Sequence, residues 1–486
     1  MVRPLLRAEH ASPLRHLREC DGCGKLLELP TLAVGTEARC PRCDAVLRRK
    51  RANSLDTPLA LALAGLVLYG VTMLTPFLSL QLLGRQRVSG VETGAASFVQ
   101  DGFWLLSALV VATLVVVPLL RLLLLLCVLL GLRRRAPPVW LFRAFRWHER
   151  LGSWAMVEVF LFGALVSFTR LVDLAEVQIG PAAYGLAALA LTLVAVNAAL
   201  EPQLVWDALD QHGATAARAA ASRAAGGGAV AGGGGASAVA PADAGGVASE
   251  AARLPAGASP GAAARPGVAS ATGPAMAARP GALRPISCDC CRLLSEALPG
   301  APCPRCGAAL HPRKPNSVAR AWALILAALI LYIPANAYPV MHIVTFGSGG
   351  PHTIVGGVVE FIQSGFWPLA LIVFLASVAV PMLKLFGLMV MLLGIHRRSA
   401  ARLRERTRLY RVVEAIGRWS MIDIFVVSVL ISLVRFGIVA NITAQVGAAC
   451  FAAVVVLTIF AADAFDPRLM WDAAGQPDTA RDESRR

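Results

Sequence analysis

Charged residues are scarce in this chain of 486 residues, where they make up 16% of the total against 56% hydrophobic residues. About a quarter of the residues in a soluble domain are charged, so this composition excludes an ordinary soluble protein. The sequence also lacks the Gly-x4-Gly-Lys-Ser/Thr phosphate-binding loop and the His-Glu-x2-His zinc-protease motif. We therefore expect a membrane protein that is not an enzyme and does not itself hydrolyse ATP.

The sequence instead contains long apolar stretches. A helix of about 20 apolar residues crosses the hydrocarbon core of a bilayer, so the predicted fold class is an all-α polytopic membrane protein. The second stretch of each half is unusually long, and we expect it to tilt or to project beyond the lipid. Eight spans are expected, near residues 59–80, 103–132, 154–172, 182–200, 320–341, 366–395, 419–440 and 446–463.

Basic residues are almost absent from every second loop between these spans. The loops at 133–150 and 396–418 hold six and eight arginines, whereas the four alternate loops hold only Arg85 and Arg87. Lys and Arg near span ends are retained in the cytoplasm. We therefore predict cytoplasmic termini, and we attribute the net charge of +16 to this topology rather than to a nucleic-acid partner. No cleavable signal peptide is expected, because a full-length span follows the polar N-terminal segment.

The chain is internally duplicated. A constant offset in residue number aligns the segment 53–131 with the segment 316–394 without a gap. After a short insertion the alignment continues to the Trp-Asp pairs at 206–207 and 471–472. Two domains therefore share one plan. Because four spans per half is an even number, we expect the two repeats to be parallel rather than inverted.

Four cysteines precede the spans of each half, as two Cys-x2-Cys pairs. Such pairs on facing turns supply the four thiolates of a structural, tetrahedral zinc site, which has no open coordination position. The pairs are 16 residues apart in the first half and 11 in the second. The predicted zinc ligands are Cys20, Cys23, Cys40 and Cys43 in the first module and Cys288, Cys291, Cys303 and Cys306 in the second.

Other roles for these cysteines stay open. Iron can replace zinc in an all-thiolate site. A Cys-x2-Cys pair can cycle as a redox dithiol, although the repeated set of four favours a metal. Paired disulfides would have to persist on the cytoplasmic face, where thiols stay reduced.

Composition marks the domain boundaries. Residues 211–284 are almost all Ala, Gly, Pro and Ser with a few Arg and no aromatic residue, which is typical of a flexible linker. The predicted segments are a zinc ribbon at 1–52, a four-helix membrane repeat at 53–210, the linker at 211–284, a second zinc ribbon at 285–315, a second repeat at 316–475 and a disordered tail at 476–486.

Charged side chains occur inside the expected spans, where each costs about 2.5–3.5 kcal/mol on insertion scales. Lys384 and Asp423 recur in the first half as Arg121 and Glu158. One hypothesis is that the two residues of each half pair, which offsets much of the desolvation cost. The other is that Lys384 and Asp423, joined by Thr458, relay protons or line a polar substrate cavity. Lysine can lose its proton and arginine cannot, so the second half is the stronger candidate.

Two further patterns accompany these charges. Pro118 and Pro381 come about one turn before the basic residue of each half, where we expect a kink. Trp206 and Trp471 close the last span of each half. We interpret them as anchors at the membrane interface, and docking against the metal modules is the alternative.

Several motifs together resemble the paraquat-inducible protein A family of Gram-negative inner membranes. They are the tandem cysteine modules, the Gln-x-Gly-Phe-Trp elements at 100–104 and 363–367, the Val-Pro-x2-Lys/Arg elements and the terminal Pro-x3-Trp-Asp elements. The resemblance covers all but the linker and the termini. The chain departs from equivalence of its halves at Arg121, where the second half has Lys384.

The resemblance implies a function that composition alone does not show. Members of that family work with a mammalian-cell-entry (MCE) protein that forms a tunnel across the periplasm, and the pair is implicated in lipid movement between the membranes. An inner-membrane subunit that loads or extracts phospholipid at the base of the tunnel is therefore expected. A membrane scaffold for the MCE partner and a zinc- or thiol-based redox stress protein are the alternatives.

Overall fold

The computed structural model describes residues 17–30, 32–50, 55–82, 84–134, 138–172, 176–211, 283–345, 348–436 and 440–475. These residues belong to one unit that contains both halves of the chain. The predicted tail, residues 212–282 of the predicted linker and the first 16 residues of the first module lie outside the described residues.

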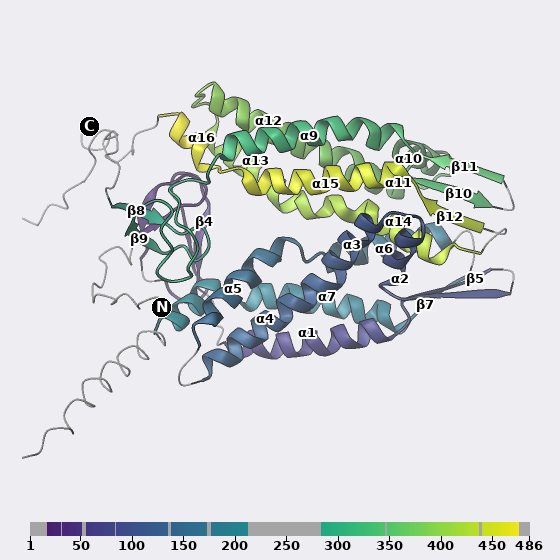
Figure 1. Ribbon diagram of the computed structural model, residues 1–486, viewed down its shortest axis with the longest axis horizontal. Helices are drawn as coiled ribbons and strands as arrows, with labels where there is room; N and C mark the ends of the chain where they lie inside the picture. The colour runs from purple at the N-terminus through teal and green to yellow at the C-terminus, as the bar shows by residue number, and fades with distance from the viewer. Residues whose placement is uncertain are drawn as a thin grey trace, which may run out of the picture. The chain divides into compact units, whose positions relative to one another are not determined.

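The prediction of eight spans in a mostly helical protein is confirmed. Figure 1 shows the long helices running side by side. Eight helices are long and apolar enough to cross a membrane, and they are Asp56–Leu74, Trp104–Leu132, Trp140–Thr169, Pro181–Ala199, Ser317–Ala337, Ala370–His396, Leu403–Leu433 and Val446–Ala464.

The same succession of helices builds each half, as the duplication predicts. The first half consists of α1 (Asp56–Leu74), α2 (Thr93–Gln100), α3 (Trp104–Val111), α4 (Val117–Leu132), α5 (Trp140–Arg150), α6 (Val157–Val172) and α7 (Pro181–Ala199), and residues 202–211 are also helical. The second half consists of α9 (Ser317–Ala337), α10 (Ile354–Gln363), α11 (Trp367–Phe374), α12 (Val380–His396), α13 (Leu403–Ile416), α14 (Ile422–Leu433), α15 (Val446–Ala464) and α16 (Arg468–Ala473).

A small antiparallel sheet, which the sequence did not predict, joins two loops of each half. In the first half, β5 (Leu78–Leu82) lies between β6 (Arg85–Ser89) and β7 (Glu176–Ile179). In the second half, β10 (Met341–Thr345) lies between β11 (Ser348–His352) and β12 (Ala440–Ala444). The central strand follows the first span and its outer partner precedes the last span. Both sheets therefore lie at the end of the spans away from the cysteine modules, which we call the sheet end; the other is the module end (Figure 1).

Each long second span contains a π-helical turn immediately before its proline. The turns are Ala112–Val116 and Leu375–Ala379, and they lead into Pro118 and Pro381. A proline inside a helix has no N–H to donate and crowds the carbonyl four residues back. The widened turn accommodates this loss, and such turns are often found at functional sites.

Within each half the first and the last span pack together. At the start of α7, Gly180 N–H donates to Phe77 O at 3.0 Å, and a Cβ at Gly180 would lie 2.2 Å from Pro76 O. At the start of α15, Gly447 N–H donates to Pro339 O at 3.0 Å, and a Cβ there would lie 2.5 Å from the same oxygen. Only glycine allows the backbones to approach this closely.

The two halves meet along α6 and α14. The rings of Phe160 and Phe425 lie 5.5 Å apart, edge to face. Ser167 Oγ donates to Val426 O across the interface at 3.2 Å. At the sheet end, Arg435 donates to Asp101 Oδ1 at 2.6 Å, with only 14% and 10% of the two side chains exposed. Of an apolar 18-residue stretch in the third span, 78% is buried in the second half and 50% in the first half.

Candidate functional site

Each predicted set of four cysteines comes together in the structure. In the first module, the pairs lie between β1 (Leu17–Glu19) and β2 (Leu26–Glu28), and between β3 (Glu37–Arg39) and β4 (Val46–Arg49). In the second module, β8 (Arg284–Ser287) and β9 (Leu294–Ala297) flank the first pair. All eight cysteines are buried, and the four sulfurs of each set lie within 4.8 Å of one another.

One backbone pattern forms all four Cys-x2-Cys turns. The first cysteine donates its N–H to the residue five places on and accepts from the N–H four places on, as in Cys20 N to Lys25 O at 2.9 Å and Gly24 N to Cys20 O at 2.8 Å. The residue four places on has a positive φ in every turn. Two of these residues are glycines, and Asp44 (φ 60°) and Arg292 (φ 57°) adopt the same left-handed conformation.

The four-thiol sets fit a tetrahedral metal ion. Sulfurs about 2.3 Å from a central zinc ion stand about 3.8 Å apart. The cross-pair Sγ–Sγ distances are 3.5 Å for Cys20–Cys43 and 3.6 Å for Cys23–Cys40, and the second module repeats them. These cysteines are free rather than paired in disulfides. Each set can therefore hold a metal ion, with the coordination shell closed by protein sulfur.

Lys384 lies on α12 with its side chain only 1% exposed. Its Nζ donates to Gly417 O at 3.3 Å and to Ser420 Oγ at 3.5 Å. Gly417 is the C-cap of α13, so the ammonium group lies at the carbonyl end of a helix, which favours positive charge. A short 3-10 turn, Gly417–Met421, interrupts the third span here between α13 and α14.

Arg121 occupies the equivalent place on α4 and has a different partner. Its Nη2 donates to Asn197 Oδ1 of α7 at 2.9 Å. The same nitrogen lies 3.5 Å from where a Cβ would stand on Gly152, which is the counterpart of Gly417 in the 3-10 turn Leu151–Ser153. The basic residue of each half thus reaches the interruption in the third span of that half.

In both halves the basic group donates hydrogen bonds to neutral oxygens. Ion pairing of Arg121 with Glu158 and of Lys384 with Asp423 stays a prediction. Glu158 and Asp423 are half-buried near the starts of α6 and α14. Thr458 is buried on α15, where its hydroxyl donates to Val455 O at 2.8 Å.

Asp423 lines a small cavity that reaches toward the sheet end of the second half. The cavity holds about 50 Å³ and is also lined by Ser377 of the π-helical turn, by His352 and by Glu360. His352 Nδ1 lies 3.4 Å from Glu360 Oε2. This volume accommodates one or two water molecules but not a lipid chain. Sequence motifs do not identify these lining residues, because the residues come from separate segments that meet only in the folded chain.

The interpretation of the two tryptophans as interfacial anchors is wrong. Trp206 is 0% exposed and Trp471 is 4% exposed. The ring of Trp206 lies edge-on to Phe145 of α5, with centroids 4.9 Å apart. Trp471 donates from Nε1 to Thr407 Oγ1 at 3.1 Å, and Arg42 of the first module lies 4.6 Å above its ring. The alternative, docking against the modules, is what the structure shows for Trp471.

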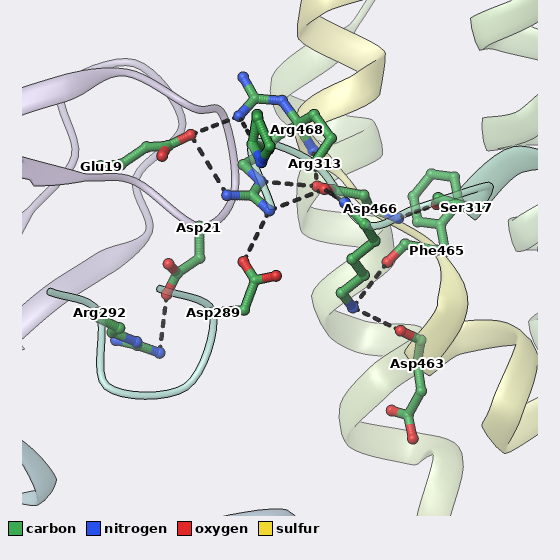
Figure 2. A network of polar contacts seen from close by, with 12 residues as sticks. Glu19, Asp21, Asp289, Arg292, Arg313, Ser317, Asp463, Phe465, Asp466 and Arg468 are labelled. Atoms are coloured by element: carbon green, nitrogen blue, oxygen red, sulfur yellow. Dashed lines mark hydrogen bonds and ion pairs between the residues drawn. The ribbon is translucent and has the colours of Figure 1, made fainter. Parts of the chain in front are cut away.

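An ionic network centred on the buried pair Arg468–Asp466 joins both modules to the end of α15 (Figure 2). Arg468 donates to Asp466 Oδ2 at 2.9 Å and to Asp289 Oδ1 at 3.0 Å, and its Nη1 lies 3.5 Å from Glu19. Arg313 links Glu19 to Asp472, each at 2.7 Å. Burial alone would raise the pKa of the Asp466 carboxyl, but the hydrogen bonds and charge of Arg468 lower it overall. The acidic-Pro pair at 466–467 was visible in the sequence, but its ionic partners were not.

Comparisons with known proteins agree with this architecture. The family model described as paraquat-inducible protein A matches residues 55–210 and 318–475. "Intermembrane transport protein PqiA" of Escherichia coli (strain K12) is 31% identical over 479 residues, which cover 98% of this chain and 100% of that protein. "Lipophilic envelope-spanning tunnel protein A" of the same strain is 27% identical over 463 residues, covering 95% of this chain and 92% of the relative.

A third relative matches a shorter part of the chain. "Probable intermembrane transport protein" of Haemophilus influenzae is 35% identical over 169 residues, which cover 35% of this chain and 41% of that protein. No solved structure matches the chain. The family model matches both halves, and one relative aligns with nearly the entire chain. The chain therefore belongs to the paraquat-inducible protein A family.

Proposed function

We propose that this chain is an integral inner-membrane subunit of a system that moves lipid, phospholipid in particular, between membranes. The observation that carries this proposal is the similarity over 98% of the chain to a relative named as an intermembrane transport protein. A relative similar over 95% of the chain is named as a lipophilic envelope-spanning tunnel protein. The eight apolar helices agree with a multi-pass membrane subunit. We assign no enzymatic step to the chain.

An MCE-type tunnel protein in the periplasm is the partner we propose. The two three-stranded sheets at the sheet end are the part of the chain that would face it. The module end, which contains both cysteine modules, is then cytoplasmic, and we propose the same side for both termini. The arginines in and beside α5 and α13 agree with this orientation, because basic residues near span ends stay in the cytoplasm. The domain boundaries predicted from composition are part of the same proposal.

Zinc is the metal that we propose for both modules, with iron as the alternative. The four-thiolate donor set and its closed geometry suit a structural ion. Metal bound there would order the turns that carry the cysteines and would take no part in transfer of the lipid. Metal analysis of the purified chain distinguishes zinc from iron, with about two ions per chain expected from the two sets.

The intramembrane site of transport, in this proposal, is the second half. Lys384 is buried beside a broken span, and Asp423 lines a cavity that opens toward the sheet end. A proton that moves from Lys384 to Asp423 would neutralise both groups at constant net charge, and the loss of two charges inside the membrane would change the free energy of the open and closed arrangements. Thr458 of the second half and the first-half counterparts Arg121 and Glu158 are the other intramembrane polar residues in this proposal.

Complementation of a strain that lacks its own family members tests the proposal. Wild type, Lys384→Ala and Asp423→Ala are compared at matched membrane abundance, with growth under a detergent that penetrates a damaged envelope as the readout. Arg143→Ala is the control, because Arg143 is an exposed residue of α5. We expect wild type and the control to restore growth and the two intramembrane variants to fail.

The alternatives give different outcomes. If both intramembrane variants rescue fully, the transport site is wrong and a scaffold that only anchors the partner is favoured. A scaffold would instead lose function when β10 or β5 is disrupted at the sheet end. A redox stress protein would respond to oxidation of the cysteine sets and would be indifferent to Lys384.

A further inference from the structure

The backbone carbonyl of the last cysteine in each module accepts a hydrogen bond from an arginine of the opposite half. Arg411 of α13, in the second half, donates from Nη2 to Cys43 O of the first module at 2.9 Å. Arg146 of α5, in the first half, donates from Nη1 to Cys306 O of the second module at 3.3 Å. The repeat places Arg146 opposite Arg411 and Cys43 opposite Cys306. The same contact therefore occurs twice, and each time it crosses between the halves.

The arginine of each Cys-Pro-Arg-Cys turn also contacts the opposite half. Arg42 of the first module stacks on Trp471 of the second half, 4.6 Å from the ring centroid. Arg305 of the second module forms ion pairs with Asp207 at 3.1 Å and Asp210 at 2.7 Å, both in the first half. The side chain of Arg305 is only 9% exposed. Hydrogen bonds between ionised groups such as these are stronger than hydrogen bonds between neutral groups.

Each module is also tied to its own half, near the point where the chain enters the first span. Arg48 pairs with Glu201 at 3.1 Å and Arg313 with Asp472 at 2.7 Å. The modules contact each other through Arg292 and Asp21, which lie 2.9 Å apart (Figure 2). Each module thus spans from its own half to the other one.

We propose that the two metal modules form a reciprocal clasp, in which each metal-ordered module binds the opposite half and holds the two halves together at the module end. The contacts use the carbonyl of the fourth cysteine and the arginine between the third and fourth cysteines, so they depend on the fold of the metal-binding turns. A module of about 30 residues has too small a core to keep that fold alone, and metal supplies the missing stability. Loss of the metal would then free α5 and α13 at the same time.

Photo-crosslinking in the full chain tests the crossed contact. A protease site is inserted within residues 212–282, and benzoylphenylalanine replaces Arg408, whose Nη2 lies 4.0 Å from Asp44 of the first module. After irradiation and cleavage, we expect the C-terminal fragment to be joined to the N-terminal fragment. Benzoylphenylalanine at Tyr184, an exposed residue of α7, is the control and should give no joined fragments.

Removal of metal is the second arm. Incubation of the zinc-loaded chain with a strong zinc chelator should lower the yield of joined fragments several-fold. A crosslink that stays within the C-terminal fragment would overturn the crossed arrangement. An equal yield of joined fragments with and without the chelator would overturn the dependence on metal.

Metal release gives a measurement that does not rely on crosslinking. In a chain with Cys288→Ser and Cys291→Ser, only the first module keeps its four thiols. Arg411→Ala, in the second half, should speed release of Zn²⁺ to a colorimetric chelator, whereas Arg146→Ala and the exposed control Arg143→Ala should leave the rate unchanged. Equal rates in all three variants, or a faster rate only with Arg146→Ala, would contradict the clasp.

Discussion

Arg121 and Lys384 occupy equivalent places in two halves of one design, yet their surroundings differ. Arg121 bonds to an amide oxygen from α7, whereas Lys384 is 1% exposed and bonds only to a backbone carbonyl and a serine hydroxyl among the described residues. The apolar 18-residue stretch of the third span is also more buried in the second half than in the first, at 78% against 50%. The positive charge of Arg121 in the first half is therefore permanent, whereas Lys384 in the second half can lose its charge by releasing a proton.

This difference suggests a division of labour after duplication. The first half contributes Asp101, which pairs with Arg435 across the interface between the halves and whose counterpart in the second half is Ser364. The second half contains the lysine and the cavity at Asp423.

Exchanging the two basic residues should have the largest effect on complementation. Lys384→Arg retains the charge but cannot release a proton, and the larger guanidinium must fit a buried space, so we expect complementation to be lost. Arg121→Lys retains a donor for Asn197 and should complement nearly as well as wild type. Growth under envelope stress at matched abundance is the measurement. Full activity of Lys384→Arg would show that deprotonation at this position is unnecessary.

Removing the ion pair between the halves should destabilise the whole chain. Arg435→Ala leaves the buried carboxylate of Asp101 without its main cation, at a cost of about 3–5 kcal/mol, as for other buried pairs that lose one partner. Thermal unfolding in detergent should show a clear drop in midpoint. The double variant Arg435→Ala with Asp101→Ala should recover part of the loss. If the single variant unfolds like wild type, the pair does not join the halves.

The glycines at the start of the last spans should behave alike in both halves. Gly180→Ala and Gly447→Ala each place a Cβ against a backbone oxygen, 2.2 Å and 2.5 Å away. Overpacking of this kind costs about 1–3 kcal/mol, so the two variants should lower the unfolding midpoint by similar amounts. Gly70→Ala, where a Cβ meets nothing within 4 Å, is the control. Unequal losses would mean that the two helix pairs are not equivalent.

The ionic network at the end of α15 should give a small, pH-dependent effect. Because Arg468 lowers the pKa of Asp466 in the folded chain, the pair stabilises the fold above the unfolded pKa of about 3.9. That contribution disappears as the pH falls through the folded pKa. Asp466→Asn should therefore unfold more easily than wild type at neutral pH and match it in strong acid. A difference that is constant with pH would contradict this assignment.

Local patterns were enough to predict the spans, the duplication and the two cysteine sets. Apolar runs, a constant offset and the Cys-x2-Cys spacing are each contained within a short segment. The sheets were missed although Leu78–Leu82 alternates between apolar and polar residues, because β7 joins β5 from nearly 100 residues away. The contact of Arg411 with Cys43 depends on packing between halves, which no single-sequence pattern records.

A role in lipid transport can be measured as transfer of phospholipid out of a membrane that contains the chain. The purified chain is reconstituted in vesicles with a fluorescent phospholipid, and the soluble MCE-type tunnel protein is added as the acceptor. We predict that the acceptor gains lipid faster with the wild-type chain than with empty vesicles, and that Lys384→Ala abolishes the gain. Transfer at the same rate with and without the chain would contradict a role in lipid transport.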